Sequence, residues 1–284
     1  MKNINKRKKV TLVKIAVVLL VLIIAVRFLD CYGSKDGEPE MPRYEMVSIE
    51  TLFDTEQISE ESLDDIEIEQ LFLQTGLGKE AIYKLCRESS DSSEIIKELK
   101  EYQKQLFSGC EQAKMVSLED GDVLVSMSQR FCYYPHGHAA IVIDGEENLM
   151  LEAKSYKAGS CVGSTNKWSK LSSFVVLRVK DEIIEQLIKE GKGNPAQNSA
   201  IYAKENLDGL KYSLIKEIRP FSESTPEYTQ CAHLVWYAYY ASGLDIDENR
   251  GLIIKPKDFL VSDVFEIVQV YGISPDRLVR ERSE

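Results

Sequence analysis

Four stretches between residues 121 and 180 constrain the fold more than any other feature of this sequence. They read GDVLVS, GHAAIVID, NLMLEAK and SFVVLRVK, and each is rich in β-branched residues and bounded by Gly, Asn or Ser. Runs of this length and composition are typical of strands. Because the four stretches lie close together in the chain, we expect them to pair as antiparallel neighbours.

Helical patterns follow the strands. Apolar residues recur at helical spacing around 181–206 and again over 229–242, where Gly243 provides a stop. The second stretch is amphipathic, with one face formed by Cys231, Leu234, Val235, Ala238 and Ala241. A small antiparallel sheet flanked by helices is an α+β layout, which is the fold class we predict for 116–284.

Residues 46–115 read as a separate helical module. Apolar positions at helical spacing lead to a stop at Gly76 and Gly78, and a second helix follows. Asp91 and Glu94 then form a possible capping box for a third. This segment carries no catalytic group of residues, so we expect a spacer or prodomain-like module packed on the domain behind it.

The first 30 residues predict where the chain resides. A basic head, KNINKRKK, precedes an apolar run that reaches the roughly 20 residues of a spanning helix if Lys14 and Arg27 snorkel to the interfaces. We therefore expect a signal-anchor over 1–30 and a Gly-, Pro- and charge-rich linker over 31–45. A cleaved signal peptide is the alternative, although no Ala-x-Ala-like site follows the run. With either, the basic head stays inside and the body is exported.

The charge balance argues against nucleic acid as a partner. The formal net charge is −11, and residues 1–30 carry seven basic side chains against one acidic one. The remaining chain is therefore more acidic than the total. Nucleic-acid phosphates repel such a surface, and no basic stripe interrupts it.

His138 is the best candidate for a working imidazole among only three histidines. It opens a predicted strand in PHGHAAIVID, where Gly137 and two alanines leave space around the ring. His136 lies in the preceding loop. His233 lies two residues after Cys231, a spacing that points the two side chains to different sides of a helix, so it is a poor base for that cysteine.

Cys231 is the candidate nucleophile. It lies in the first turn of its predicted helix, after Thr229 as the expected N-cap, and a helix N-terminus favours an ionised thiolate. A nearby imidazole favours it further and can return the proton to a leaving group. The structural alternative is a buried cysteine that acts as a small hydrophobic residue.

Two groups of motifs resemble the NlpC/P60 superfamily of cell-wall cysteine hydrolases. GLKYSL…YTQCAHLVWYAYYASGLDID looks like the catalytic-helix segment, in which Gly-x-x-Tyr precedes a Cys-x-x-Leu-Val helix. GDVLVS…HGHAAIVID…LMLEAK looks like the strand segment, in which Gly-Asp precedes a hairpin that begins with histidine. The strands come first here, so roughly 117–262 resembles the circularly permuted, papain-like branch.

The resemblance implies two further site residues. Glu152 stands where the family places a polar residue, often histidine, to orient the catalytic ring, and a carboxylate suits that role. It shares a face with His138 only if paired residue numbers sum to an even value, as with a three-residue turn at 145–147; a two-residue turn makes Ser155 the candidate. Tyr212 matches the family's tyrosine and, with the backbone N–H of Cys231, is a candidate oxyanion donor. Packing is the alternative for Tyr212, and Asp122 reads as a turn residue.

The other cysteines are candidates for disulfides, which persist outside the cell. Cys132 and Cys161 lie beyond the two open ends of the 138–154 hairpin, and Cys86 and Cys110 lie in the helical module. Pairing each couple leaves Cys231 free, with Cys31 at the membrane. No spacing suggests zinc, and we expect neither metal nor cofactor.

The resulting expectation is a membrane-anchored cysteine peptidase or amidase outside the cytoplasm, with peptidoglycan stem peptides as substrate. One alternative is an acyltransferase or lipid-amide hydrolase on the same fold. The other is a non-catalytic wall-binding protein.

Overall fold

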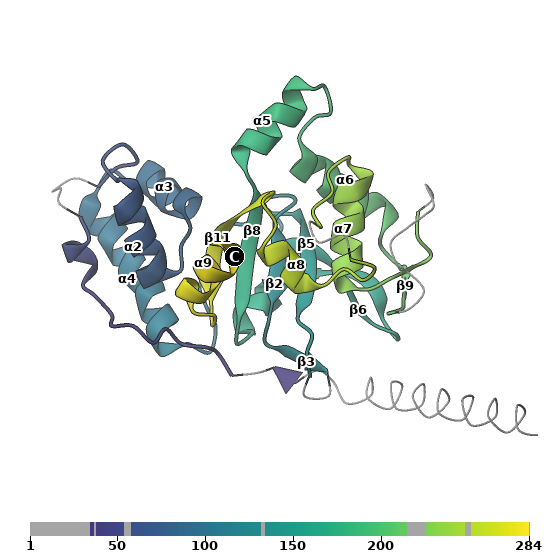
Figure 1. The fold of residues 1–284 in the computed structure, drawn as a ribbon, viewed down its shortest axis with the longest axis horizontal. Helices are drawn as coiled ribbons and strands as arrows, with labels where there is room; N and C mark the ends of the chain where they lie inside the picture. Colours follow the sequence, from purple (N-terminus) through teal and green to yellow (C-terminus); the bar gives the residue numbers. More distant parts are fainter. Residues whose placement is uncertain are drawn as a thin grey trace, which may run out of the picture.

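The computed structural model describes residues 35–36, 38–53, 58–131, 134–214, 225–247 and 251–283. Their centre is a six-stranded antiparallel sheet in the order β11-β8-β2-β5-β6-β7 (Figure 1). The strands are β2 (Val123–Ser126), β5 (His138–Asp144), β6 (Leu149–Ser155), β7 (Gly159–Ser164), β8 (Phe174–Val179) and β11 (Phe265–Tyr271). The predicted α+β class and the antiparallel pairing of the four β-branched stretches are confirmed.

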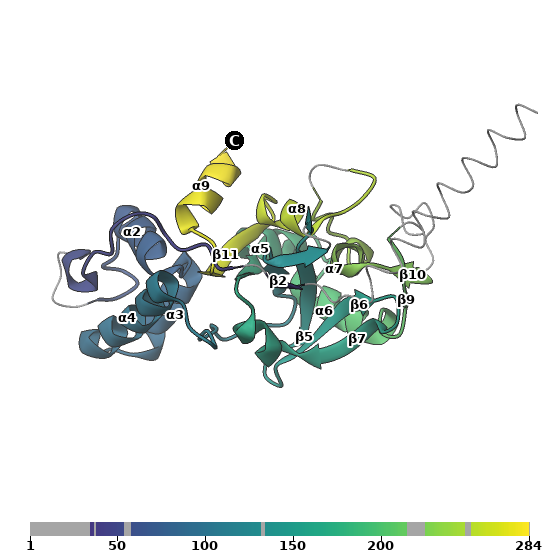
Figure 2. The same ribbon diagram turned by 90° about the horizontal axis from the view of Figure 1, so that it is seen from below.

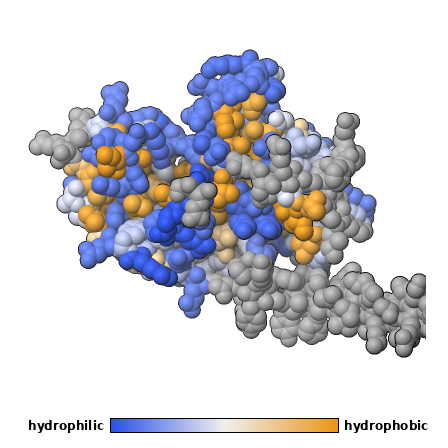
Figure 3. Space-filling model, in the orientation of Figure 1, coloured by the Kyte–Doolittle hydropathy of each residue, from blue (hydrophilic) through white to orange (hydrophobic). Residues whose placement is uncertain are grey.

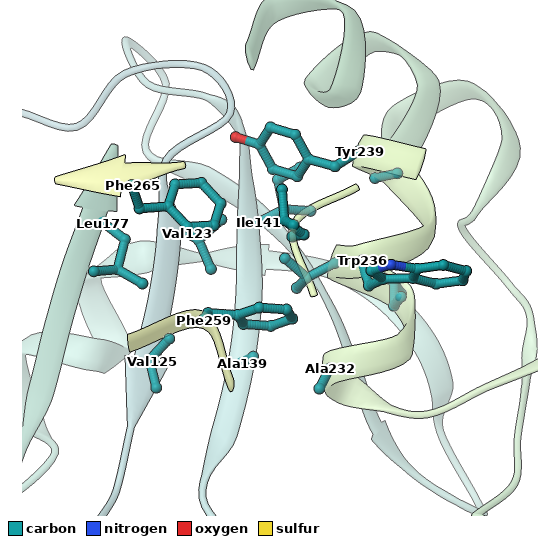
Figure 4. Packing of buried hydrophobic residues seen from close by; sticks show 14 of the residues in the cluster. Val123, Val125, Ala139, Ile141, Leu177, Ala232, Trp236, Tyr239, Phe259 and Phe265 are labelled. Carbon is teal, nitrogen blue, oxygen red and sulfur yellow. The ribbon is translucent and has the colours of Figure 1, made fainter. Parts of the chain in front are cut away.

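Helices cover both faces of the sheet because its central strands are apolar on both sides. In β2, Val123 and Val125 face one core while Leu124 faces the other, which is the alternation of a pleated strand. The first face is covered by α5 (Asp181–Lys189), α6 (Pro195–Asn206), α7 (Cys231–Ala241), α8 (Pro256–Leu260) and α9 (Pro275–Ser283). Figure 4 shows Ala232 and Tyr239 of α7 directed toward the strands.

The second face packs against the 3-10 helix η2 (Thr165–Lys170) and shares its core with the N-terminal helices. These are the 3-10 turn η1 (Ile49–Thr51) and helices α2 (Asp65–Thr75), α3 (Lys79–Glu88) and α4 (Ser92–Ser108). Leu71 and Leu99 share one core with Val176 of the sheet. Figures 1 and 2 both place α2, α3 and α4 beyond the β11 edge, away from α7. The predicted helical module therefore packs on the sheet domain.

The helix limits follow the local sequence with two corrections. The stretch expected around 181–206 is two helices, because the chain breaks at Gly191 and Asn194 caps α6 with Pro195 in its first turn. Asp91 does cap α4, but its predicted partner Glu94 accepts a hydrogen bond from Ser89 instead. The complete capping box lies at Asp64 and Glu67, at the start of α2.

Helix α7 is buried on every side, contrary to the predicted amphipathic pattern. Its first nine residues are all buried. They lie between the sheet and α6, whose Tyr202 packs against Tyr237 of α7. The polar groups of His233 and Tyr239 lie inside the protein, so the polar letters in CAHLVWYAYY do not mark a solvent-facing side. Helix packing on two sides outweighs the helical periodicity here.

A glycine turn attaches the helical module to the sheet edge. Gly78 N–H donates to Val268 at 2.8 Å, and Val270 N–H donates to Gly76 at 2.7 Å. The backbones approach so closely that a Cβ on Gly78 would lie 1.6 Å from the carbonyl oxygen of Ile267. The turn thus pairs with β11, a strand edge that would otherwise be open to pairing with other chains.

The remaining strands are short. Strand β1 (Lys35–Asp36) pairs with β3 (Gln129–Phe131), which pairs with β4 (Tyr134–Pro135), while β9 (Lys211–Tyr212) runs parallel to β10 (Tyr228–Thr229). The expected signal-anchor over 1–30 lies outside the described residues. In the part of the chain that is described, none of the helices has both the length and the apolar character needed to cross a membrane. The face seen in Figure 3 is largely hydrophilic, with apolar side chains in separate groups.

Candidate active site

His138 is fixed at the first position of β5. The preceding Gly137 has φ 72°, and a Cβ there would lie 2.9 Å from the carbonyl oxygen of Ser126 and 3.3 Å from Pro256. The positive φ and the close approach of the Ser126 backbone and the Pro256 ring favour glycine here, which fixes the direction in which the chain enters β5. His138 is paired with Ser126 of β2, and its side chain is buried.

The register of the β5–β6 hairpin brings Glu152 to His138. Ile141 pairs with Leu151 and Val142 with Met150, and both pairs sum to an even number. Glu152 therefore points to the same face as His138, and the two side chains are joined by a hydrogen bond of 2.7 Å between Nε2 and Oε2. The predicted contact is confirmed.

The turn that sets this register differs from the predicted one. It covers four residues, 145–148, rather than three, and Asn148 takes φ 55°. A four-residue turn alone would reverse the facing, but a β-bulge between Val142 and Asp144 restores it. Ser155, the alternative partner, instead accepts a hydrogen bond from Ala158 N–H.

Cys231 is the first residue of α7, as predicted, and is 5% exposed. Its thiol lies beside the ring of His138, close enough to raise the pKa of that ring. Because Nε2 of that ring is occupied by Glu152, Nδ1 is left for the sulfur. The structure thus brings together the three residues proposed as catalytic, from the starts of α7 and β5 and the middle of β6.

Gln230, rather than the expected Thr229, caps α7. Its Oε1 accepts from Ala232 N–H at 2.9 Å and lies 3.4 Å from the sulfur of Cys231, and its Nε2 donates to Ile254. Thr229 instead contacts Nδ1 of His233 at 3.1 Å. The cap and the nucleophile are therefore held by one side chain.

The charges of the site favour an imidazolium beside a carboxylate. Burial opposes the charge on His138, but its interactions with Cys231 and Glu152 outweigh burial and raise the pKa of His138 to about 9. Burial likewise opposes ionisation of Glu152, but hydrogen bonds from His138 and Lys167 lower its pKa to about 2. A protonated ring at neutral pH is the state that can stabilise a thiolate and donate a proton.

Lys167 and Trp168 complete the site and were not predicted. Both lie in η2, where Lys167 Nζ pairs with Oε1 of Glu152 and Trp168 stacks on the His138 ring with centroids 5.7 Å apart at 16°. A short 3-10 helix has no periodic pattern, so the sequence offers no signal for either residue.

Tyr212 lies on a short strand that pairs with the segment just before α7. It is paired with Thr229 across β9 and β10, two residues before Cys231, and its ring packs against Tyr156 at 5.0 Å. This position agrees with the neighbourhood predicted for it. Its role as an oxyanion donor remains a prediction.

Three other polar residues lie apart from this centre. Asp122 is buried in an ion pair with Arg178 at 2.8 Å, and its carboxylate also accepts a hydrogen bond from Glu119 N–H across the turn. These contacts agree with its interpretation as a turn residue. His233 is a buried packing residue beside Trp236 and Tyr237, and burial lowers its pKa to about 4. His136 is exposed between β4 and β5.

The cysteines do not form the expected bridges. Cys86 and Cys110 both carry free thiols, so the bridge predicted between them is wrong. Cys161 is also free, which overturns its pairing with Cys132, a residue outside the described part of the chain along with Cys31. Within the described residues, no cluster of three or more His, Cys, Asp or Glu side chains could hold a metal ion.

A scan against protein-family models and searches of curated proteins and of solved structures found no match to this chain.

Proposed function

We propose that this protein is a membrane-anchored cysteine hydrolase that acts outside the cytoplasm on amide bonds of peptidoglycan stem peptides. The observation that carries the proposal is the 2.7 Å hydrogen bond between His138 and Glu152, with the thiol of Cys231 beside the same ring. A nucleophile, a base and an orienting group in this order are the arrangement of nucleophilic acyl transfer. The order of motifs, with His138 before Cys231, supports a permuted papain-like fold.

The proposed reaction begins at the thiolate of Cys231. The sulfur attacks the amide carbonyl carbon, and the C–S bond forms as the carbonyl electrons move to oxygen. Collapse breaks the C–N bond while His138 gives its proton to the leaving amine, leaving a thioester. Water then attacks the thioester carbonyl and gives a proton to His138. Collapse breaks the C–S bond, which releases the acid and restores the thiolate and imidazolium.

Two donors are assigned to the oxyanion. One is the backbone N–H of Cys231, since the capping oxygen of Gln230 is taken up by the next N–H, that of Ala232. The second is the hydroxyl of Tyr212, a role supported by the pairing of Tyr212 with Thr229, two residues before Cys231. Glu152 takes no proton in this scheme; it holds the ring and stabilises its charge.

The substrate and the location follow from the sequence. The basic head and apolar run of residues 1–30 predict export, and the resemblance to wall hydrolases predicts peptide amides of peptidoglycan. The test is digestion of purified wall material by the full chain, with new amino termini counted. Release by the parent and none by Cys231→Ala is expected; equal release by both would end the proposal.

A lipid-amide hydrolase or acyltransferase is the second candidate, favoured by one observation. Leu252 and Ile253 are 68% and 53% exposed, and they directly precede Ile254, whose carbonyl accepts from Gln230 beside the nucleophile. Apolar side chains at that position suit an acyl chain. Cleavage of an N-acyl amide together with inactivity on wall peptides would select this candidate.

A further inference from the structure

The two residues of η2 at the site act on different parts of the His138–Glu152 pair. Glu152 uses Oε2 for His138 and Oε1 for Lys167, so each carboxylate oxygen has one hydrogen-bond partner. Trp168, 1% exposed, lies flat against the imidazole. The carboxylate and the ring are thus each held by one of two consecutive residues.

The helix η2 is itself fixed on several sides. Ser164 caps it by accepting from Asn166 N–H at 3.2 Å, and Thr165 N–H donates to Asn148 in the β5–β6 turn at 2.9 Å. Ser169 accepts from Ala113 N–H at 2.7 Å, in the segment that follows α4. Lys167 and Trp168 therefore sit on a rigid element rather than on a free loop.

Strand β7 leaves room for the lysine. A Cβ on Gly163 would lie 2.9 Å from Lys167 Nζ and 3.7 Å from its Cε, so the ammonium group occupies the space beside this glycine. Gly163 has no positive φ in the structure, so its backbone conformation does not require glycine. The absence of a side chain is what this position requires. The path from η2 to Glu152 is open because residue 163 has no side chain.

The other groups that face Glu152 do not replace Lys167. Lys154 on the same strand lies 3.9 Å from Oε1 and keeps 55% of its side chain exposed, so water screens it. Cys161 is the partner of Glu152 across β6 and β7. On the other side stands His138, whose charge disappears each time it gives up its proton. Lys167 is then the closest permanent positive charge on a carboxylate that is 3% exposed.

We infer that Lys167 is a positioning residue. It keeps Glu152 ionised and directed at His138 while the ring is neutral, after His138 has given its proton to the leaving amine. The inference rests on the proposed function. Only a reaction in which the His138 ring becomes neutral leaves Glu152 in need of a second positively charged partner. Trp168 holds the ring plane in the same interval. A buried carboxylate beside a neutral imidazole would otherwise gain a proton and lose its role.

The test compares Lys167→Met with Lys167→Arg in the full chain. Two quantities are followed from pH 2 to 9: the titration of the Glu152 carboxyl by ¹³C NMR, and the rate at which iodoacetamide alkylates Cys231, located by peptide mass. In Lys167→Met we expect the Glu152 titration and the acid limb of alkylation both to move up by about one pH unit. Arginine restores both, because its charge reaches the same oxygen.

Two further variants isolate the cause. Lys170→Met removes an exposed charge from the same helix and should leave both curves unchanged. Gly163→Ala leaves Lys167 in the chain but pushes its ammonium group away from Glu152, so it should shift both curves in the direction of Lys167→Met, by less.

The outcomes separate this inference from the proposed function. Unmoved curves in Lys167→Met, or equal shifts in Lys170→Met, overturn the inference, and so does a Glu152 shift with unchanged alkylation. If both curves move as expected but neither wall peptides nor N-acyl amides are cleaved by the parent, the role of Lys167 stands and the proposed function fails.

Discussion

Replacement of Glu152 by glutamine tests the charge of the third residue while keeping its shape. In the structure two donors, His138 Nε2–H and Lys167 Nζ, each find one oxygen of Glu152. Glutamine offers one oxygen and one NH₂ group, so one of the two donors must face another donor. Because Lys167 can turn toward water, we expect the amide oxygen to stay on His138 and the main loss to be the negative charge.

The size of that loss follows from the pKa of Glu152. Its lowering from 4.5 to about 2 corresponds to about 3 kcal/mol in favour of the ionised form. Since His138 and Lys167 share this stabilisation, between half and all of it is lost from the imidazolium. The pKa of His138 should therefore fall from about 9 by one to two units, and the rate should fall by about 10- to 100-fold.

The assay is the pH dependence of amide hydrolysis and of Cys231 alkylation. The folded pKa of His138 is raised, so its proton is present at neutral pH and is lost as pH rises through about 9. The basic limb of the hydrolysis profile should lie there in the parent and one to two units lower in Glu152→Gln, while alkylation, which needs only the thiolate, shows whether Cys231 stays reactive. Glu146→Gln, at an exposed position in the turn of the same hairpin, is the control. A rate within twofold of the parent and an unmoved basic limb would refute the reasoning.

Three other predictions concern stability and the helix cap. Burial lowers the pKa of His233 from 6.5 to about 4, so the unfolded chain binds a proton that the folded one refuses; the free energy of unfolding should fall by up to about 3 kcal/mol as pH drops through this range. Urea unfolding at pH 7 and pH 4.5 measures this, and an equal fall in His233→Gln would contradict it. Gly78→Ala places a Cβ 1.6 Å from Ile267 oxygen and should cost roughly 3 kcal/mol; an unchanged Tm would show that the turn does not hold β11. Gln230→Ala removes the cap of α7 and should cost about 1 kcal/mol and slow Cys231 alkylation, so a parent-like rate and Tm would rule out this double role.

The strands were predictable where burial on both faces leaves a continuous β-branched run. This holds for β2, β5 and β8, whose residues are almost all buried. Strand β7, GSCVGS, lies at the sheet edge and carries glycine and serine, so its composition resembles a loop. Strand β11 lies far along the chain from its partner β8, and nothing local indicates that pairing.

The site was predictable only where one residue's local setting carried the signal. His138 after Gly137 and Cys231 at a helix start could be found in the sequence alone. Glu152 depended on a register that a bulge in β5 determines, and bulges leave no clear mark in sequence. Lys167 reaches the site from another element through tertiary packing alone.

Helix α7 shows how tertiary packing overrides a pattern. Its apolar stripe predicted one buried face, yet the described chain covers it on several sides, and His233 and Tyr239 are buried as well. The predicted disulfides failed for a related reason. Neither the proximity of Cys161 to a hairpin end nor the presence of Cys86 and Cys110 in one helical module determines where their sulfur atoms lie in the fold.

The most direct test of the central claim is to trap the acyl-enzyme on Cys231. The full chain is mixed separately with wall peptides and with an N-acyl amide, quenched in acid within seconds and weighed intact by mass spectrometry. The account predicts a mass increase equal to the acyl fragment, located on Cys231, removed by hydroxylamine and absent from Cys231→Ala. Substrate consumption by Cys231→Ala at the rate of the parent would contradict it.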